Sequence, residues 1–206
     1  MKAINNALDG TLTLTDYSVA LSGSSADVAA ALDGTFASTY TGAATVNNAH
    51  TLAQLKTINN GTSGTITLND VTVALEGSAA DIKAALAGTF AAGYTGNVTL
   101  GDANSASVAA TDISTIEGDT SGTVTVSNNI NITGTAAEIT SAVGVVDTFS
   151  GTPTATLSNA HNLAQLKAIN NAVAGTIALN DYTVALSGSS SDVAAALAGT
   201  FASTYT

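Results

Sequence analysis

The chain has 206 residues, of which 45% are hydrophobic, 9% charged and 4% aromatic, and its formal net charge is −11. With four basic residues, all of them lysines, it would repel a phosphate backbone or an anionic membrane surface, which disfavours both as partners. The absence of cysteine excludes disulfides and thiolate metal sites, and no apolar run has the length of a membrane span.

A short alternating segment recurs seven times along the chain. In residues 64–70 it reads Gly-Thr-Ile-Thr-Leu-Asn-Asp, so that Ile66 and Leu68 face one way and Thr65 and Thr67 the other. This period of two, rich in β-branched residues, predicts a strand, and the Asn or Asp that follows favours a corner. The copies begin at residues 10, 43, 64, 97, 123, 154 and 176.

The copies belong to two kinds of unit, long and short, which alternate. Residues 167–206 nearly repeat the sequence that begins at residue 2, at an offset of 165. Long units begin near residues 10, 64, 122 and 175, short units begin near residues 43, 97 and 154, and residues 1–9 read as the end of a truncated unit. We therefore expect residues 1–206 to form one continuous stack without an internal boundary.

Each short unit predicts a strand followed by a helix. In the first, Thr51 is a natural N-cap with Gln54 as its capping-box partner, and Leu52, Leu55 and Ile58 form an apolar stripe. Asn162 and Gln165 repeat the capping arrangement. Asn59-Asn60 is expected to end the helix. The middle short unit is a variant with an insertion at 103–111, and it keeps Ile113 and Ile116 in the stripe.

Each long unit predicts a second extended piece, then a helix and an aromatic pair. The second piece, residues 71–75 in one copy, could form a hairpin around Asn69-Asp70 or turn a corner into another sheet. Asn-Asp is a weaker hairpin turn than Asn-Gly, which favours the corner. Ser or Thr caps the helix with an acid three residues on, and Phe and Tyr are expected to cover its end. The cap pairs are Ser24/Asp27, Ser78/Asp81, Thr135/Glu138 and Ser189/Asp192, and the aromatic pairs are Phe36/Tyr40, Phe90/Tyr94 and Phe201/Tyr205.

Strands that alternate with helices at a short period predict an α/β repeat solenoid of stacked β-(β)-α units. A mainly parallel sheet is expected on one face and short helices on the other. Neither end of the chain has an obvious polar capping repeat, so we expect a tendency to stack end to end with neighbouring repeats or other copies.

A column of acids and amides at the strand corners is a first candidate site. Calcium accepts carboxylate and amide oxygens, so the column could form a calcium ladder. The alternative, which we favour, is a column of turns in which Asn and Asp bond their own backbone. The column contains Asp16, Asp70, Asp102, Asp181, Asn48, Asn128 and Asn159.

The threonines of the strands are a second candidate site. They resemble the Thr-x-Thr arrays of ice-binding β-solenoids, where a flat regular surface orders water. The simpler interpretation is that threonine suits an exposed strand face, and Ala43, Asn97 and Ala178 interrupt the rows. The rows contain Thr11, Thr13, Thr45, Thr65, Thr67, Thr99, Thr123, Thr125, Thr154 and Thr156.

The two histidines, His50 and His161, occupy equivalent positions in the repeat. Separated by most of the repeat offset, they cannot share a metal, and we interpret them as corner or helix-entry residues. No paired carboxylates, catalytic triad or phosphate-binding glycine pattern stands out from the repeats. We therefore expect no enzyme activity, no catalytic, cofactor-binding or metal residues, and no cofactor.

Residues 163–171, Leu-Ala-Gln-Leu-Lys-Ala-Ile-Asn-Asn, with residues 175–181 and 185–197, resemble tandem repeats of very large proteins of cyanobacteria and other aquatic bacteria. The likeness covers most of the chain and weakens between 101 and 151. It implies an αβ-solenoid within a secreted or cell-surface protein and transfers no functional residue. The expected function is a structural module, a rigid spacer or scaffold from a larger natural or edited repeat protein. The alternative is a binding surface, for calcium at the corner column or for ice at the threonine face.

Overall fold

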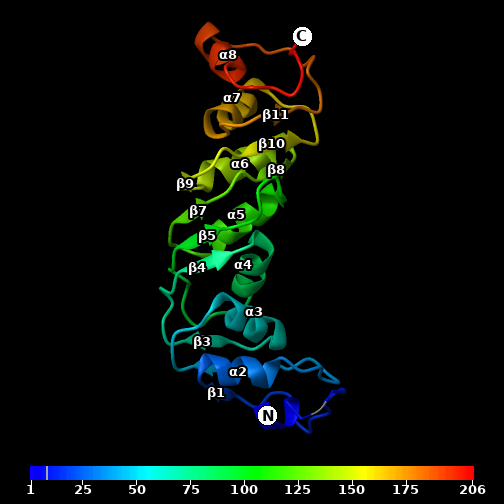
Figure 1. Cartoon of the computed structure of the whole chain (residues 1–206), viewed down its shortest axis with the longest axis vertical. Helices are drawn as coiled ribbons and strands as arrows, with labels where there is room; N and C mark the ends of the chain where they lie inside the picture. Colours follow the sequence, from blue (N-terminus) through cyan, green and yellow to red (C-terminus); the bar gives the residue numbers. More distant parts are fainter. Residues whose placement is uncertain (8) are drawn as a thin grey trace. The chain divides into compact units, whose positions relative to one another are not determined.

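A computed structural model describes residues 1–7 and 9–206 (Figure 1). Leu8, within the partial unit expected at residues 1–9, lies outside the described residues. The chain divides into two compact units, one formed by Met1–Val98 with Asp119–Thr123 and the other by Thr99–Gly118 with Val124–Thr206. Both are α/β, with parallel strands connected through helices, which confirms the expected class at this level.

In the first unit, strands from consecutive segments pair in parallel and the helices between them pack side by side. Leu21 pairs with Ala44, and Ala44 with Ile66, so successive partners lie 22 or 23 residues apart. A parallel connection needs a crossover of about a dozen residues or more, and a short helix supplies it. The elements are α1 (Lys2–Asn5), β1 (Leu21–Gly23), α2 (Ser25–Leu32), β2 (Ala44–Val46), α3 (Leu52–Gly61), β3 (Ile66–Leu68), β4 (Leu75–Gly77) and α4 (Ala79–Leu86).

The second unit repeats this plan around a parallel sheet of order β11-β10-β8-β6. A further parallel pair joins β7 to β9, and α6, α7 and α8 pack one against the next. It contains most of β5 (Val98–Leu100) and α5 (Ala110–Asp119), with β6 (Ser107–Ala109), β7 (Val124–Val126), β8 (Asn131–Gly134), α6 (Ala136–Val145), β9 (Thr148–Phe149), β10 (Thr154–Leu157), α7 (Leu163–Ala172), β11 (Ile177–Ala178) and α8 (Ser190–Leu197).

The core of each unit lies between its strands and its helices. In the first unit, Val46 and Ile66 from the strands meet Val28, Leu32 and Ile58 from the helices, all of them buried. In the second unit, Ile132, Ile139, Leu166, Ile169 and Ile177 are each fully buried. These are the apolar positions of the alternating strands and helical stripes, as the sequence predicts.

The expected caps are confirmed. Thr51 with Gln54, Thr135 with Glu138, and Asn162 with Gln165 form complete capping boxes. The hydroxyls of Ser24, Ser78 and Ser189 accept the backbone N–H three residues on. These contacts join residues close in the sequence, so a cap can be recognised without the fold.

The second extended piece turns a corner, because β3 and β4 belong to different sheets. The expected strand at 71–75 is wrong in its bounds: residues 71–74 are irregular and β4 begins at Leu75. Two side chains account for this. Asp70 accepts two hydrogen bonds from Thr72, which fixes the turn. The Tyr94 hydroxyl donates a hydrogen bond to the Val73 carbonyl, which a neighbouring strand would otherwise use.

Two further boundaries are corrected. The first short-unit helix, expected to end at Asn59-Asn60, continues one residue further to Gly61, and the Asn59 amide donates to the next helix. The residues read as an insertion at 103–111 contain strand β6 and the first residues of α5. β6 pairs with β8 and so takes part in the sheet.

Candidate functional site

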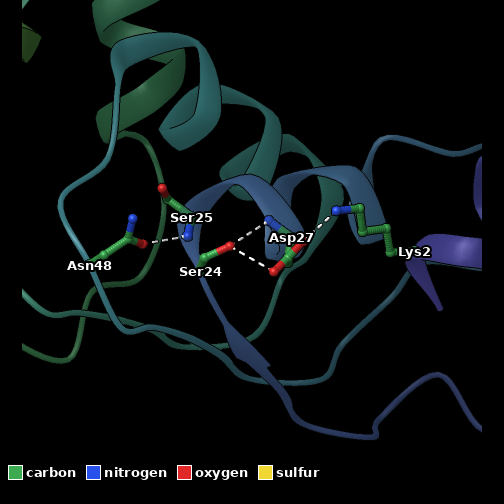
Figure 2. A network of polar contacts seen from close by, with 5 residues as sticks. All are labelled: Lys2, Ser24, Ser25, Asp27 and Asn48. Carbon is green, nitrogen blue, oxygen red and sulfur yellow. Dashed lines mark hydrogen bonds and ion pairs between the residues drawn. The ribbon is translucent and has the colours of Figure 1, made fainter.

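The N-terminus of α2 is held by side chains from three segments of the chain (Figure 2). The Ser24 hydroxyl accepts a hydrogen bond from Asp27 N at 3.1 Å and donates to Asp27 Oδ2 at 2.8 Å. From α1, the Lys2 ammonium pairs with Asp27 Oδ1. From the segment that follows α2, Asn48 Oδ1 accepts from Ser25 N at 2.7 Å. One helix start therefore contacts both the preceding and the following segments.

The lysine–aspartate part of this network recurs at α4 and α8. Lys56 pairs with Asp81, and Lys167 with Asp192, again between residues 25 apart. These hydrogen bonds from lysine, more than those from the capping serines, lower the pKa of Asp27, Asp81 and Asp192. The carboxylates are exposed, so each pair ties the helices together only weakly.

An asparagine one turn further along each short-unit helix makes a second contact with the next helix. Asn59 Nδ2 donates to the Ala84 carbonyl at 2.6 Å, and Asn5 and Asn170 make the same bond to Ala30 and Ala195. The amides lie against Gly34, Gly88 and Gly199, where an added Cβ would overlap the asparagine side chain. These glycines are therefore required by a close approach of the preceding, asparagine-bearing helix.

The middle of the chain lacks both contacts. Ser114 and Glu117 on α5 occupy the positions of Lys56 and Asn59, as Ile113 and Ile116 match Leu55 and Ile58. Within the described residues, neither Ser114 nor Glu117 donates a side-chain hydrogen bond to α6. The isoleucines are fully buried, so the apolar stripe persists where the polar ties are lost.

Each histidine is linked to a tyrosine 44 residues later. His50 Nε2 lies 3.1 Å from Tyr94 Oη, and Tyr94 Oη lies 2.5 Å from the Val73 carbonyl oxygen. Because the tyrosine proton goes to the carbonyl, its oxygen accepts from the His50 Nε2–H. His161 and Tyr205 repeat the arrangement at 3.1 Å. The prediction that the histidines stand at helix entries is confirmed, since His50 directly precedes the N-cap Thr51.

The histidines are buried in the neutral form. His50 and His161 are each 4% exposed, and the Nδ1 atoms have no hydrogen-bond partner. Burial lowers the pKa of both imidazoles, and Asp70 and Asp181 oppose this only partly. The same burial raises the pKa of Tyr94 and Tyr205. Because each tyrosine hydroxyl also donates to a carbonyl, each pair forms a hydrogen-bond chain that joins separate segments.

The aromatic pairs are confirmed as contacts, with ring centroids 5.7 Å apart for Phe36 and Tyr40 and 6.3 Å apart for Phe90 and Tyr94. The pairs were expected to cover a helix end, but this prediction did not include the hydrogen bond that the tyrosine makes. The Tyr40 hydroxyl donates to the Val19 carbonyl, as Tyr94 does to Val73, and so anchors the irregular piece before β1.

Three of the four aspartates of the corner column bond their own turns. Asp16, Asp70 and Asp181 each accept from the backbone N–H and the hydroxyl of the residue two positions on, at 2.6–2.8 Å. These bonds lower the pKa of the three carboxyls. In the part of the chain that the structure describes, no three His, Cys, Asp or Glu side chains gather where they could hold a metal ion.

The asparagines of the same column do something different. Asn48 and Asn159 were expected to bond their own backbone, and this is wrong: they accept from Ser25 N and Ala136 N, at the start of the preceding helix. Asn128 donates to the Asp102 carbonyl at 2.8 Å. These partners lie 23–26 residues away, and no local sequence signal marks them.

The threonines stand in mixed rows. Ser22, Thr45 and Thr67 are in register in the first unit. In the second, Thr156 lies between Thr133 and Ala178. The Thr154 and Thr156 hydroxyls donate to Asn131 Oδ1 at 3.2 and 3.1 Å, so the protein itself orients them.

A groove of about 670 Å³ in the first unit lies between the end of α2 and the end of α3. Its charged lining residues are Asp33 and Lys56, and Lys56 already pairs with Asp81. The other polar side chains are those of serine, threonine, asparagine and Tyr40, whose hydroxyl donates to the Val19 carbonyl. This arrangement offers hydrogen-bonding groups and the carboxylate of Asp33.

Comparison with known protein families, curated proteins and solved structures finds no match to this chain. Among the described residues, no helix combines the length and apolar character needed to cross a bilayer. What the geometry provides is therefore a set of contacts that repeat from one segment to the next.

Proposed function

We propose that the chain is a structural repeat module, a rigid spacer or scaffold from a larger secreted or cell-surface protein. The observation that carries this is the constant spacing of its contacts. Strands pair 22–24 residues apart, and helices are tied by side chains 25 residues apart. Outside the variant helix α5, segments thus meet through equivalent atoms, which supports a solenoid, whose stability comes from neighbouring repeats.

The polar chemistry supports a scaffold. The carboxylates of Asp27, Asp81 and Asp192 are engaged with lysines and serines, and the buried histidines are engaged with tyrosines. Groups that act on a substrate need free lone pairs or protons directed into a cleft. Here these groups are used to join segments.

A spacer must keep its ends at a fixed distance, which spin labels can measure. Because the chain has no cysteine, Thr13→Cys and Ser203→Cys, both at exposed positions, can be labelled selectively. We expect a narrow electron–electron distance distribution, as narrow as that of a pair inside the second unit, Ser141→Cys and Ser203→Cys. A distribution much broader than this internal reference would exclude a rigid spacer.

A further inference from the structure

The groove in the first unit is formed by two segments that the fold brings together, residues 32–40 and 56–63. Its volume of about 670 Å³ is within the range of about 300–1,000 Å³ that is usual for small-molecule sites. Of its lining residues, Leu32, Tyr40 and Thr62 are buried. The groove therefore combines fixed, buried residues with polar side chains that are open to solvent, namely those of Asp33, Ser38, Thr39, Asn60 and Ser63.

Asp33 stands where a carboxylate is unfavourable for the helix. It is the C-cap of α2, whose last turn has no basic residue. The carbonyl groups at this end of a helix carry partial negative charge, which repels a carboxylate. Within the described residues, the exposed Asp33 side chain makes no hydrogen bond or ion pair that would offset this repulsion. The helix therefore gains nothing from the carboxylate.

Two helices of the same length show that the fold does not need this residue. α4 has Ala87 at the C-cap and α8 has Ala198, in place of Asp33. The structural positions beside it do not change, since Leu86 and Tyr94 stand where the first copy has Leu32 and Tyr40. Asp33 is thus a feature of this groove and is not required to build the unit.

The lining of the groove selects the class of ligand. The Asp33 carboxylate and the net charge of −11 repel an anion. A calcium ion takes six to eight oxygen ligands and favours several carboxylates, whereas this groove offers one carboxylate and the ammonium of Lys56. Its hydroxyl and amide groups both donate and accept hydrogen bonds, and the half-buried ring of Phe36 adds an apolar surface. A neutral sugar has the matching chemistry, with hydroxyls at its edge and C–H groups on its faces.

We propose that this groove is a binding site for a neutral hexose oligosaccharide. Asp33 accepts hydrogen bonds from the sugar hydroxyls, Ser38, Thr39 and Asn60 add neutral hydrogen bonds, and a sugar ring lies against Phe36. Tyr40 holds the ring of Phe36 in place, with the ring centroids 5.7 Å apart. The site gives the chain a binding activity in addition to a spacer role.

The probes are maltotriose, cellotriose, mannotriose and galactotriose, each titrated into the intact, ¹⁵N-labelled protein and followed by NMR. We expect at least one of them to cause saturable shifts at millimolar concentration, confined to the amides of residues 32–40 and 56–63. Asp33→Ala should weaken this binding about tenfold or more, because a charged hydrogen-bond acceptor is lost. Glu76→Ala is the matched control and should leave binding intact, since it removes an exposed carboxylate outside the groove.

Melting temperatures of the unliganded variants separate ligand binding from a structural role. Because alanine occupies the same C-cap in α4 and α8, Asp33→Ala should keep or raise the melting temperature. A clear fall would show that Asp33 supports the fold, and it would overturn the assignment of this carboxylate to a ligand.

Absence of saturable shifts with all four trisaccharides at tens of millimolar would overturn the proposal, as would binding that Asp33→Ala leaves unchanged. Shifts at the groove caused by calcium or by a sulfated disaccharide, and by none of the neutral sugars, would also overturn it, in favour of an ion. The spin-label distances are measured on the unliganded chain, so the rigid spacer is tested separately from this site.

Discussion

Asn59 and Gly88 illustrate how one contact constrains two residues. The Asn59 amide donates to Ala84 O and leaves no room for a side chain at Gly88. We expect Gly88→Ala to lower the free energy of unfolding by about 1–3 kcal/mol, since the new methyl group must displace a bonded amide. Gly93→Ala is the control: a Cβ there meets nothing within 4 Å, and the change should stay within about 0.5 kcal/mol. Urea titration measures both.

The source of this cost can be checked with a double variant. If the overlap with Asn59 is responsible, Asn59→Ala should make Gly88→Ala nearly harmless, so that the two changes together cost less than their sum. Additive costs would show that Gly88 is needed for another reason.

The buried histidines predict a pH dependence. Burial lowers the folded pKa of His50 and His161 below the ordinary value of 6.5, so the unfolded chain binds protons first. Stability should therefore be highest above about pH 6.5 and should fall as the pH drops below it. In the variant with His50→Gln and His161→Gln, which keeps an N–H donor for each tyrosine, this decline should be flatter. Urea midpoints measured across this range test the prediction, and an unchanged slope in the variant would contradict it.

Asp27, Asp81 and Asp192 change the stability in a separate, more acidic pH range, so they provide an internal reference for the histidine effect. Their pKa values are lowered from 3.8 by lysine and serine, so their contribution is present above that value and is lost as the pH falls below it. The loss in strong acid should persist in the histidine variant.

At the scale of elements, two kinds of tie join α3 to α4, and they should differ in strength. The Lys56–Asp81 pair is 40% and 44% exposed, whereas Asn59 is partly buried with its amide bonded to a carbonyl. We expect Lys56→Met to cost less than about 1 kcal/mol and to matter less at high salt. Asn59→Ala should cost about 1–2 kcal/mol at any salt concentration, because it leaves the Ala84 carbonyl without its partner. Thermal or urea unfolding at low and high salt distinguishes them. Equal costs would mean that the ion pair is stronger than its exposure implies.

The variant helix α5 shows which part of the element plan is indispensable. It has lost the lysine and the asparagine of the other short units but keeps Ile113 and Ile116 at 0% exposure. The position of His50 is taken by Val108, which is also buried, and the loop after α6 has no tyrosine. Histidine and tyrosine are thus absent together here, and a buried histidine without its tyrosine would lose its hydrogen-bond partner.

At the scale of the whole molecule, calcium provides the first test of the corner column. The Asp16, Asp70 and Asp181 carboxylates are already satisfied by their own turns. We expect melting curves with excess calcium and with a chelator to superimpose. A ligand that binds the folded state raises stability by about 2.7 kcal/mol at a hundredfold excess over its Kd, which calorimetry would detect. A clear upward shift with calcium would make the column a metal site.

The sequence by itself determined the parts of this protein that depend on near neighbours. Alternating Thr-apolar segments marked the core residues of the strands, and Ser-x-x-Asp and Thr-x-x-Gln marked the helix starts, because caps and periodicity act over a few residues. The asparagine–aspartate corner was also correct, since Asp70 bonds a residue two positions on.

The tertiary structure alone decided the contacts between segments. Asn48 caps a helix that begins 23 residues before it, His50 meets a tyrosine 44 residues later, and the Asn59 amide donates to a carbonyl 25 residues on. Each depends on the register in which parallel strands and packed helices meet. A local pattern cannot fix that register, because the energy that selects it comes from burying both neighbours at once.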